Sequence, residues 1–93
     1  MEIRIGILGY GLVGSELAKI LQKDNRFKVM LVGVKNMHDR NSNIFTQDLT
    51  SISNDPSIDI IIDALPGIEP SESVIIAAIK NNKTIISCNK ELS

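Results

Sequence analysis

The stretch IGILGYGLVGSELA, residues 5–18, decides how this chain folds. It places Gly9, Gly11 and Gly14 between an apolar run and a segment with helical spacing. A GxGxxG loop that follows a strand and opens a helix is typical of dinucleotide-binding units. There the first glycine permits the turn, the second lets a pyrophosphate approach the backbone, and the third lets the helix lie close to the strand. The alternative is a glycine-rich turn that binds nothing.

Composition indicates one soluble globular domain over residues 1–93, with 43% apolar and 23% charged residues. The net charge of -1 and the scarcity of aromatic residues argue against a nucleic-acid partner. No apolar run reaches the roughly 20 residues that a membrane helix needs, and the opening MEIRIG does not resemble a signal peptide. The single cysteine, Cys88, cannot form an internal disulfide, which favours the reduced cytoplasm.

Apolar runs alternate with segments of helical spacing along the whole chain. Strands are expected at residues 3–8, 28–34, 58–65 and 84–88, and helices at 12–23, 44–53 and from Pro70 to about Lys80. Strands that alternate with helices form parallel sheets with right-handed crossovers. We therefore predict an α/β, Rossmann-like, three-layer αβα fold with a parallel four-stranded sheet in the order 3-2-1-4.

The end of the second expected strand carries basic side chains. NAD-specific sites usually place Asp or Glu about 20 residues beyond the glycine loop, to bind the adenosine ribose. Here the chain reads Val34-Lys35-Asn36, with His38 and Arg40 beyond. Lys35 could pair with the 2′-phosphate of NADP. The expected cofactor is therefore NADP or NAD, with NADP favoured. A solvated basic loop is the alternative for this segment.

Two further segments are expected at the same edge of the sheet, because ligands of open parallel sheets bind beyond the carboxyl ends of the strands. They are ALPG, residues 64–67, and SCNK, residues 87–90. Lys90 is either an ordinary surface lysine or a side chain that faces the substrate near the nicotinamide. No metal site is expected. The expected cofactor-binding residues are Gly9, Tyr10, Gly11, Leu12, Val13, Gly14, Lys35, Asn36, Ala64, Leu65, Pro66, Cys88, Asn89 and Lys90.

Three motifs together resemble the N-terminal cofactor domain of homoserine dehydrogenase. They are the glycine loop, the GIEP turn at residues 67–70, and the Asn89-Lys90 pair after a strand. The resemblance implies an oxidoreductase that reduces aspartate 4-semialdehyde to homoserine with NADPH or NADH, in threonine and methionine biosynthesis. It also implies that Lys90 is the catalytic lysine that assists proton transfer, and that Leu65 contacts the cofactor. Leu65-Pro66 depart from the small or hydroxyl residues that many members have there.

The 93 residues are short for this family, whose substrate-binding and dimerising domain would follow. We therefore expect a shortened NAD(P)-binding domain that is inactive alone, because a hydride donor must be held against an oriented carbonyl carbon. The last strand would be an exposed edge, which favours a homo-oligomer. The alternatives are a standalone nucleotide-binding or regulatory module and a non-catalytic remnant that binds nothing.

Overall fold

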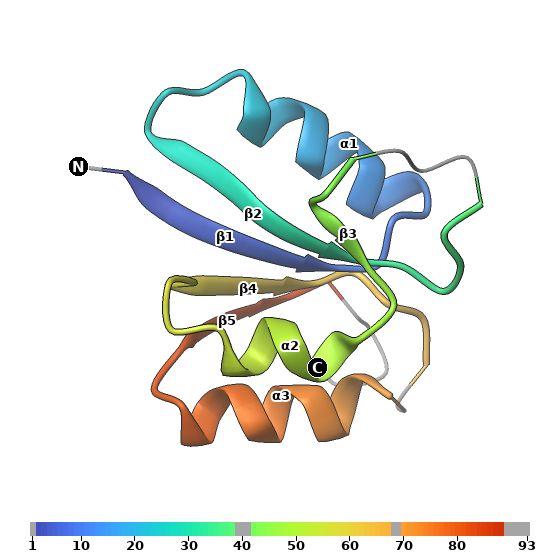
Figure 1. Ribbon diagram of the computed structural model, residues 1–93, viewed down its shortest axis with the longest axis vertical. Helices are drawn as coiled ribbons and strands as arrows, with labels where there is room; N and C mark the ends of the chain where they lie inside the picture. The colour runs from blue at the N-terminus through green and yellow to red at the C-terminus, as the bar shows by residue number, and fades with distance from the viewer. Residues whose placement is uncertain (1, 39–41, 68–69, 89–93) are drawn as a thin grey trace.

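The computed structural model describes residues 2–38, 42–67 and 70–88 and has three layers (Figure 1). A central sheet has α1 on one face and the pair α2 and α3 on the other. The strands are β1 Ile3–Leu8, β2 Phe27–Gly33, β3 Phe45–Thr46, β4 Ile60–Asp63 and β5 Thr84–Ser87. The helices are α1 Leu12–Gln22, α2 Leu49–Asn54 and α3 Ser71–Lys80. The predicted α/β, Rossmann-like architecture with three layers is confirmed.

The sheet is parallel throughout, and its order is β3-β2-β1-β4-β5. The numbered order 3-2-1-4 recurs within a sheet of five strands, not the predicted four, but its third strand is Phe45–Thr46 and not the segment over 58–65. Phe45–Thr46, predicted within a helix over 44–53, forms the short third strand beside β2, and the helix begins only at Leu49. A strand of two residues is too short to show an alternating pattern.

The extra strand changes the partners of the later ones. The segment predicted as the third strand, over 58–65, is β4 and pairs with β1 along Ile5–Ile60 to Leu8–Asp63. The segment predicted as the fourth strand is β5, and it pairs with β4 and forms the second edge of the described sheet. As a result, the carboxyl ends of β2, β1 and β4 lie side by side.

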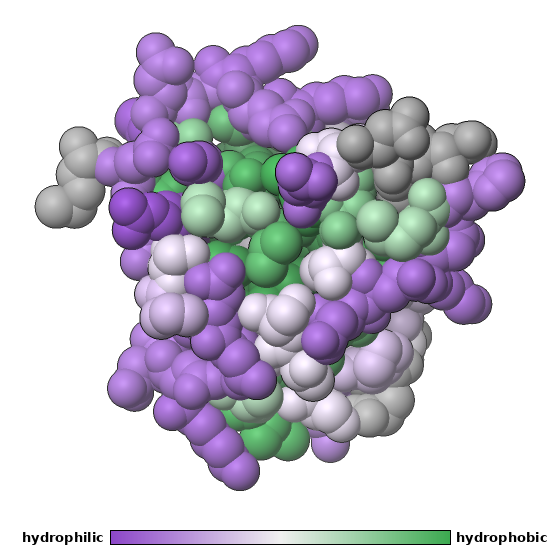
Figure 2. Space-filling model, viewed as in Figure 1, coloured by the Kyte–Doolittle hydropathy of each residue, from purple (hydrophilic) through white to green (hydrophobic). Residues whose placement is uncertain are grey.

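Alternation along the strands divides the core into two halves, because successive side chains of a strand point to opposite faces of the sheet. Ile5 and Ile7 of β1 are buried with Ala18 beneath α1. Leu8 is buried on the opposite face, with Ile52 of α2 and Val74 of α3. Hydrophilic residues cover much of the outer surface, and hydrophobic residues gather between the helical layers (Figure 2).

Candidate nucleotide-binding site

The carboxyl ends of β1, β2 and β4 enclose a cavity of about 290 Å³. Its walls are the glycine loop, the exit from β2 and the exit from β4. The lining residues are Gly9, Tyr10, Gly11, Val34, Lys35, Asn36, Ala64, Leu65 and Pro66. A second hollow of about 410 Å³ shares part of this wall and extends toward Gln47, Leu49 and Pro70. Eight of the residues predicted from the sequence therefore line one cavity.

The fold itself requires glycine at two positions of the loop. Gly9 has a φ of 100°, which side chains other than glycine rarely adopt, and a Cβ there would lie 2.8 Å from the Ala64 carbonyl oxygen. A Cβ on Gly14 would overlap the carbonyl oxygen of Gly9. The amide of Gly9 donates to the Gly33 carbonyl at 2.8 Å, which ties the loop to β2. These two glycines let the chain turn sharply and let α1 pack against the end of β1.

Gly11 differs from the other two because none of the residues that the structure describes excludes a side chain there. Its φ is -75°, and a Cβ would have no atom of the described residues within 4 Å. Gly11 is the N-cap of α1, and no side chain caps this helix end. The next residues, Leu12 and Val13, are 83% and 51% exposed. The first turn of α1 therefore presents backbone amides and a partial positive charge to open space, which is the arrangement that binds phosphate.

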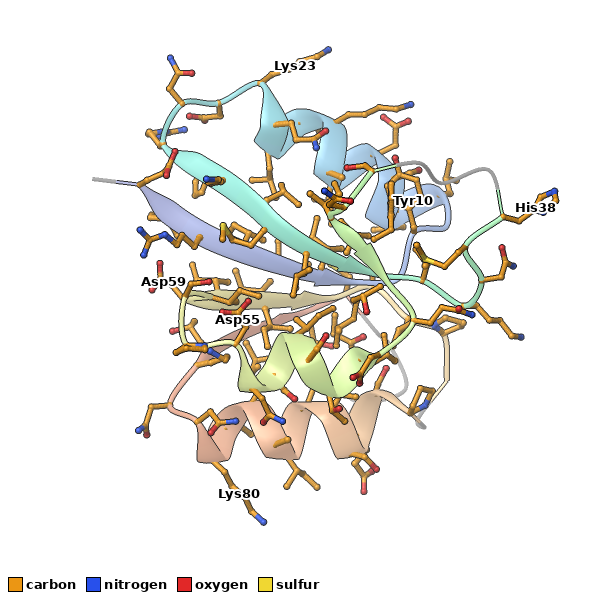
Figure 3. The ribbon with its side chains drawn as sticks, viewed as in Figure 1. Tyr10, Lys23, His38, Asp55, Asp59 and Lys80 are labelled. Carbon is orange, nitrogen blue, oxygen red and sulfur yellow. The ribbon has the colours of Figure 1, made fainter. Side chains whose placement is uncertain are left out.

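The exit from β2 presents exposed polar side chains. Lys35, Asn36 and His38 are exposed, and the Asn36 side chain accepts a bond of 3.1 Å from the His38 amide. Gln47 donates to the Lys35 carbonyl at 2.9 Å and fixes the backbone below the lysine. His38 extends away from the cavity (Figure 3). Of the basic group, Lys35 lines the cavity and His38 does not, while Arg40 lies outside the described residues.

An aromatic pair joins the glycine loop to β3. The rings of Tyr10 and Phe45 meet edge to face, with centroids 4.9 Å apart and an angle of 77°. Tyr10 lies beside the start of α1 (Figure 3). The sequence reading missed the contact because it placed Phe45 in a helix, and no local signal relates two residues 35 positions apart. The pair places the ring of Tyr10, a cavity-lining residue, against β3.

The exits from β4 and β5 are joined by main-chain hydrogen bonds. The Ala64 amide donates to the Leu8 carbonyl at 2.8 Å, and the Cys88 amide donates to the Asp63 carbonyl at 2.8 Å. Cys88 is an exposed free cysteine just beyond β5. Asn89 and Lys90 lie outside the described residues, so the role predicted for Lys90 stays a prediction. Asp63, which the sequence reading did not select, is completely buried at this edge.

Two features are absent from the described part of the chain. Within residues 2–38, 42–67 and 70–88, no group of three or more His, Cys, Asp or Glu side chains could hold a metal ion. No helix of the same segments has the length and apolar character needed to cross a membrane.

A parallel sheet with a glycine loop between its first strand and first helix, and a cavity at the carboxyl ends, defines a Rossmann-type dinucleotide-binding domain. The model of one family, described as "Homoserine dehydrogenase, NAD binding domain", matches residues 9–93. The chain belongs to this family, and its function is that of the NAD-binding domain of homoserine dehydrogenase-like proteins. The resemblance stated from the sequence motifs is thus confirmed.

Relatives in sequence and in structure agree with this assignment. The chain is 36% identical to a homoserine dehydrogenase of Synechocystis sp. and 30% identical to that of Bacillus subtilis, and each match covers 97% of the present chain. A crystal structure of S. aureus homoserine dehydrogenase matches 97% of the chain with a TM-score of 0.86 and 29% identity. The chain spans 24% of each of the two curated relatives and 26% of the S. aureus chain.

Proposed function

We propose that the cavity binds a nicotinamide dinucleotide, with its pyrophosphate at the first turn of α1, over Gly11. The observation that carries this proposal is the open space at Gly11. At an ordinary backbone conformation glycine costs about 0.4–1 kcal/mol of stability relative to alanine, because it leaves the unfolded chain more freedom. A glycine that the packing of the described residues does not require therefore calls for another reason. A ligand that approaches the backbone at this point supplies one, because a Cβ would occupy its place.

The exit from β2 supports NADP as the preferred form. Lys35 is exposed, lines the cavity and follows β2 at the position where NAD-specific sites carry an acid. An ammonium group there can form a charge-assisted hydrogen bond with a 2′-phosphate. The Asn36 side chain lies next to it and can bind ribose hydroxyls.

By its family, the chain would contribute to the reduction of aspartate 4-semialdehyde to homoserine, on the route to threonine and methionine. The nicotinamide supplies the hydride when it is bound. The residues of this chain, Cys88 and Asn89 among them, would bind and orient the cofactor, and Lys90 would assist proton transfer. We propose that residues 1–93 by themselves form the cofactor-binding domain and turn over no substrate, since they span about a quarter of the length of these relatives.

Titration of the purified chain with NADPH, NADH and ADP tests the proposal. Fluorescence reports on the two reduced dinucleotides and calorimetry on ADP. We expect both dinucleotides to bind, NADPH more tightly than NADH. Binding of ADP with the affinity of the dinucleotides would favour a standalone nucleotide-binding or regulatory module. Absence of binding by all three would refute the proposal and favour a remnant that binds nothing.

The β5 edge supports self-association. Ile86 of β5 is 48% exposed and lies in the same row as Ile7 and Ile62, on the face that α1 covers only over β1 and β2. An exposed edge strand with an apolar side chain favours pairing with another chain. We propose a homo-oligomer in the cytoplasm, and a strictly monomeric profile in sedimentation velocity at increasing concentration would contradict the oligomer.

A further inference from the structure

Asp63 is a completely buried acid at the point where β4 ends and the cavity wall begins. It lies in register with Leu8 of β1 and with Ser87 of β5. Its side chain is on the face of the sheet that α3 covers, because Ile62 before it packs on the α1 face. An acidic side chain is rarely buried unless hydrogen bonds or a charged partner offset the loss of its hydration.

The two carboxylate oxygens of Asp63 have different surroundings. Oδ1 accepts two hydrogen bonds, from the Leu65 amide at 3.1 Å and from the Ser71 hydroxyl at 3.1 Å. Oδ2 is buried and has no hydrogen-bond partner among the described residues. An unpartnered buried oxygen costs stability, and an apolar residue of similar size would avoid that cost if the position served only the core. The residue is therefore better explained by what Oδ1 holds.

The bonds to Oδ1 hold two positions near the cavity wall. Leu65 lies at its start, and Ser71 is the first residue of α3. Leu65 and Pro66 line both hollows, and Pro70 lines the larger one. The carbonyl of Asp63 also accepts the bond from the Cys88 amide, so one residue fixes the exits from β4 and β5.

We propose that Asp63 is a positioning residue for the dinucleotide: through Oδ1 it holds the wall formed by Leu65 and Pro66 at the distance from the glycine loop that the cofactor requires. The inference rests on the proposed function. A wall that is already ordered binds with less loss of conformational entropy, so releasing it lowers affinity. Asp63 acts through Leu65 and Pro66 and need not contact the ligand.

The test compares NADPH dissociation constants of four proteins, measured by fluorescence well below each melting temperature. Asp63→Ala removes the acceptor and should weaken binding about tenfold. Asp63→Asn keeps an oxygen for both bonds and should bind within about twofold of the parent. Val74→Ala is the matched control. Val74 belongs to α3, as Ser71 does, is 3% exposed and lines neither hollow. It should lower the melting temperature and leave affinity unchanged.

Each outcome separates the inference from the proposed function. If the parent binds NADPH and Asp63→Ala binds as well as Val74→Ala, the positioning role is refuted and the proposed function stands. If Asp63→Asn loses as much affinity as Asp63→Ala, the charge or Oδ2 matters and the Oδ1 account is refuted. If the parent binds no dinucleotide, both fail. Should Asp63→Ala not fold, Asp63→Ser replaces it, since its shorter hydroxyl does not reach both donors, and unchanged affinity in that variant refutes the inference.

Discussion

Replacing the glycines of the loop one at a time separates the needs of the fold from those of the ligand. Gly11→Ala adds a Cβ that meets no atom within 4 Å in the described part of the chain, at a φ of -75° that alanine readily adopts. Alanine restricts the unfolded chain and stabilises by about 0.4–1 kcal/mol. It is also a poorer N-cap than glycine, which costs about the same. We therefore expect the free energy of unfolding to change by less than about 1 kcal/mol.

Binding should respond in the opposite way. The added methyl group projects into the space proposed for the pyrophosphate, and forcing a methyl-sized group into a close contact costs about 1–3 kcal/mol. That range corresponds to a loss of about 5- to 150-fold in affinity for NADPH. Fluorescence titration measures the affinity, and thermal unfolding followed by circular dichroism measures the stability of the same sample.

Gly14→Ala provides the matched control, because Gly14 lies in the first turn of α1, three residues beyond its N-cap Gly11. Its Cβ would overlap the Gly9 carbonyl oxygen, so we expect destabilisation of at least about 1–3 kcal/mol. For a domain of this size, each kcal/mol lowers the melting temperature by about 4–8 °C. If Gly11→Ala binds NADPH as tightly as the parent, the argument from open space at Gly11 is wrong. If Gly14→Ala is as stable as the parent, the described packing of α1 on the loop is wrong.

Three further predictions follow from other parts of the structure. Lys35→Ala should weaken NADPH binding about 5- to 10-fold more than NADH binding, since only the phosphate loses a charged partner, and an equal loss for both would show that Lys35 does not read the 2′-phosphate. Hydrogen bonds from Arg26 lower the pKa of Asp24 from its ordinary 3.8 to about 2, so the carboxylate contributes stability above pH 4 that is lost as the pH falls toward 2. Asp24→Asn should flatten acid unfolding in that window, and an unchanged acid transition would contradict the pairing. Ile52→Ala should cost about 2–5 kcal/mol in urea unfolding, because Ile52 is completely buried between α2 and the sheet, and a loss below 1 kcal/mol would mean that α2 does not pack as described.

Much of the fold was predictable because its signals are local. The glycine loop, the change from alternating to helical spacing after it, and the turn at Pro66 and Gly67 all lie within short windows. The same windows placed Gly11 and Lys35 at one edge of the sheet, since every strand of a parallel sheet ends there. Local patterns gave the type and sequence of every element except β3, with their approximate ends.

Strand pairing and burial could not be predicted in this way. The third strand is only Phe45–Thr46. Because the prediction lacked this strand, it placed β4 beside β2, whereas β4 pairs with β1. The contact of Tyr10 with Phe45, and the burial of Asp63 against Ser71, join residues that have no common local pattern. An acid after an apolar run predicts an exposed loop residue as readily as a buried acceptor.

The sequence by itself therefore determined that this chain forms βα units with a phosphate-binding loop, and that it belongs with the cofactor domains of homoserine dehydrogenases. Only the tertiary structure decided which strands are neighbours, that Gly11 faces open space while Gly14 does not, and that Asp63 lies beneath the cavity wall. The physical reason is that backbone preference and side-chain periodicity depend on adjacent residues. Strand partners and desolvation depend on segments that meet only when the chain has folded.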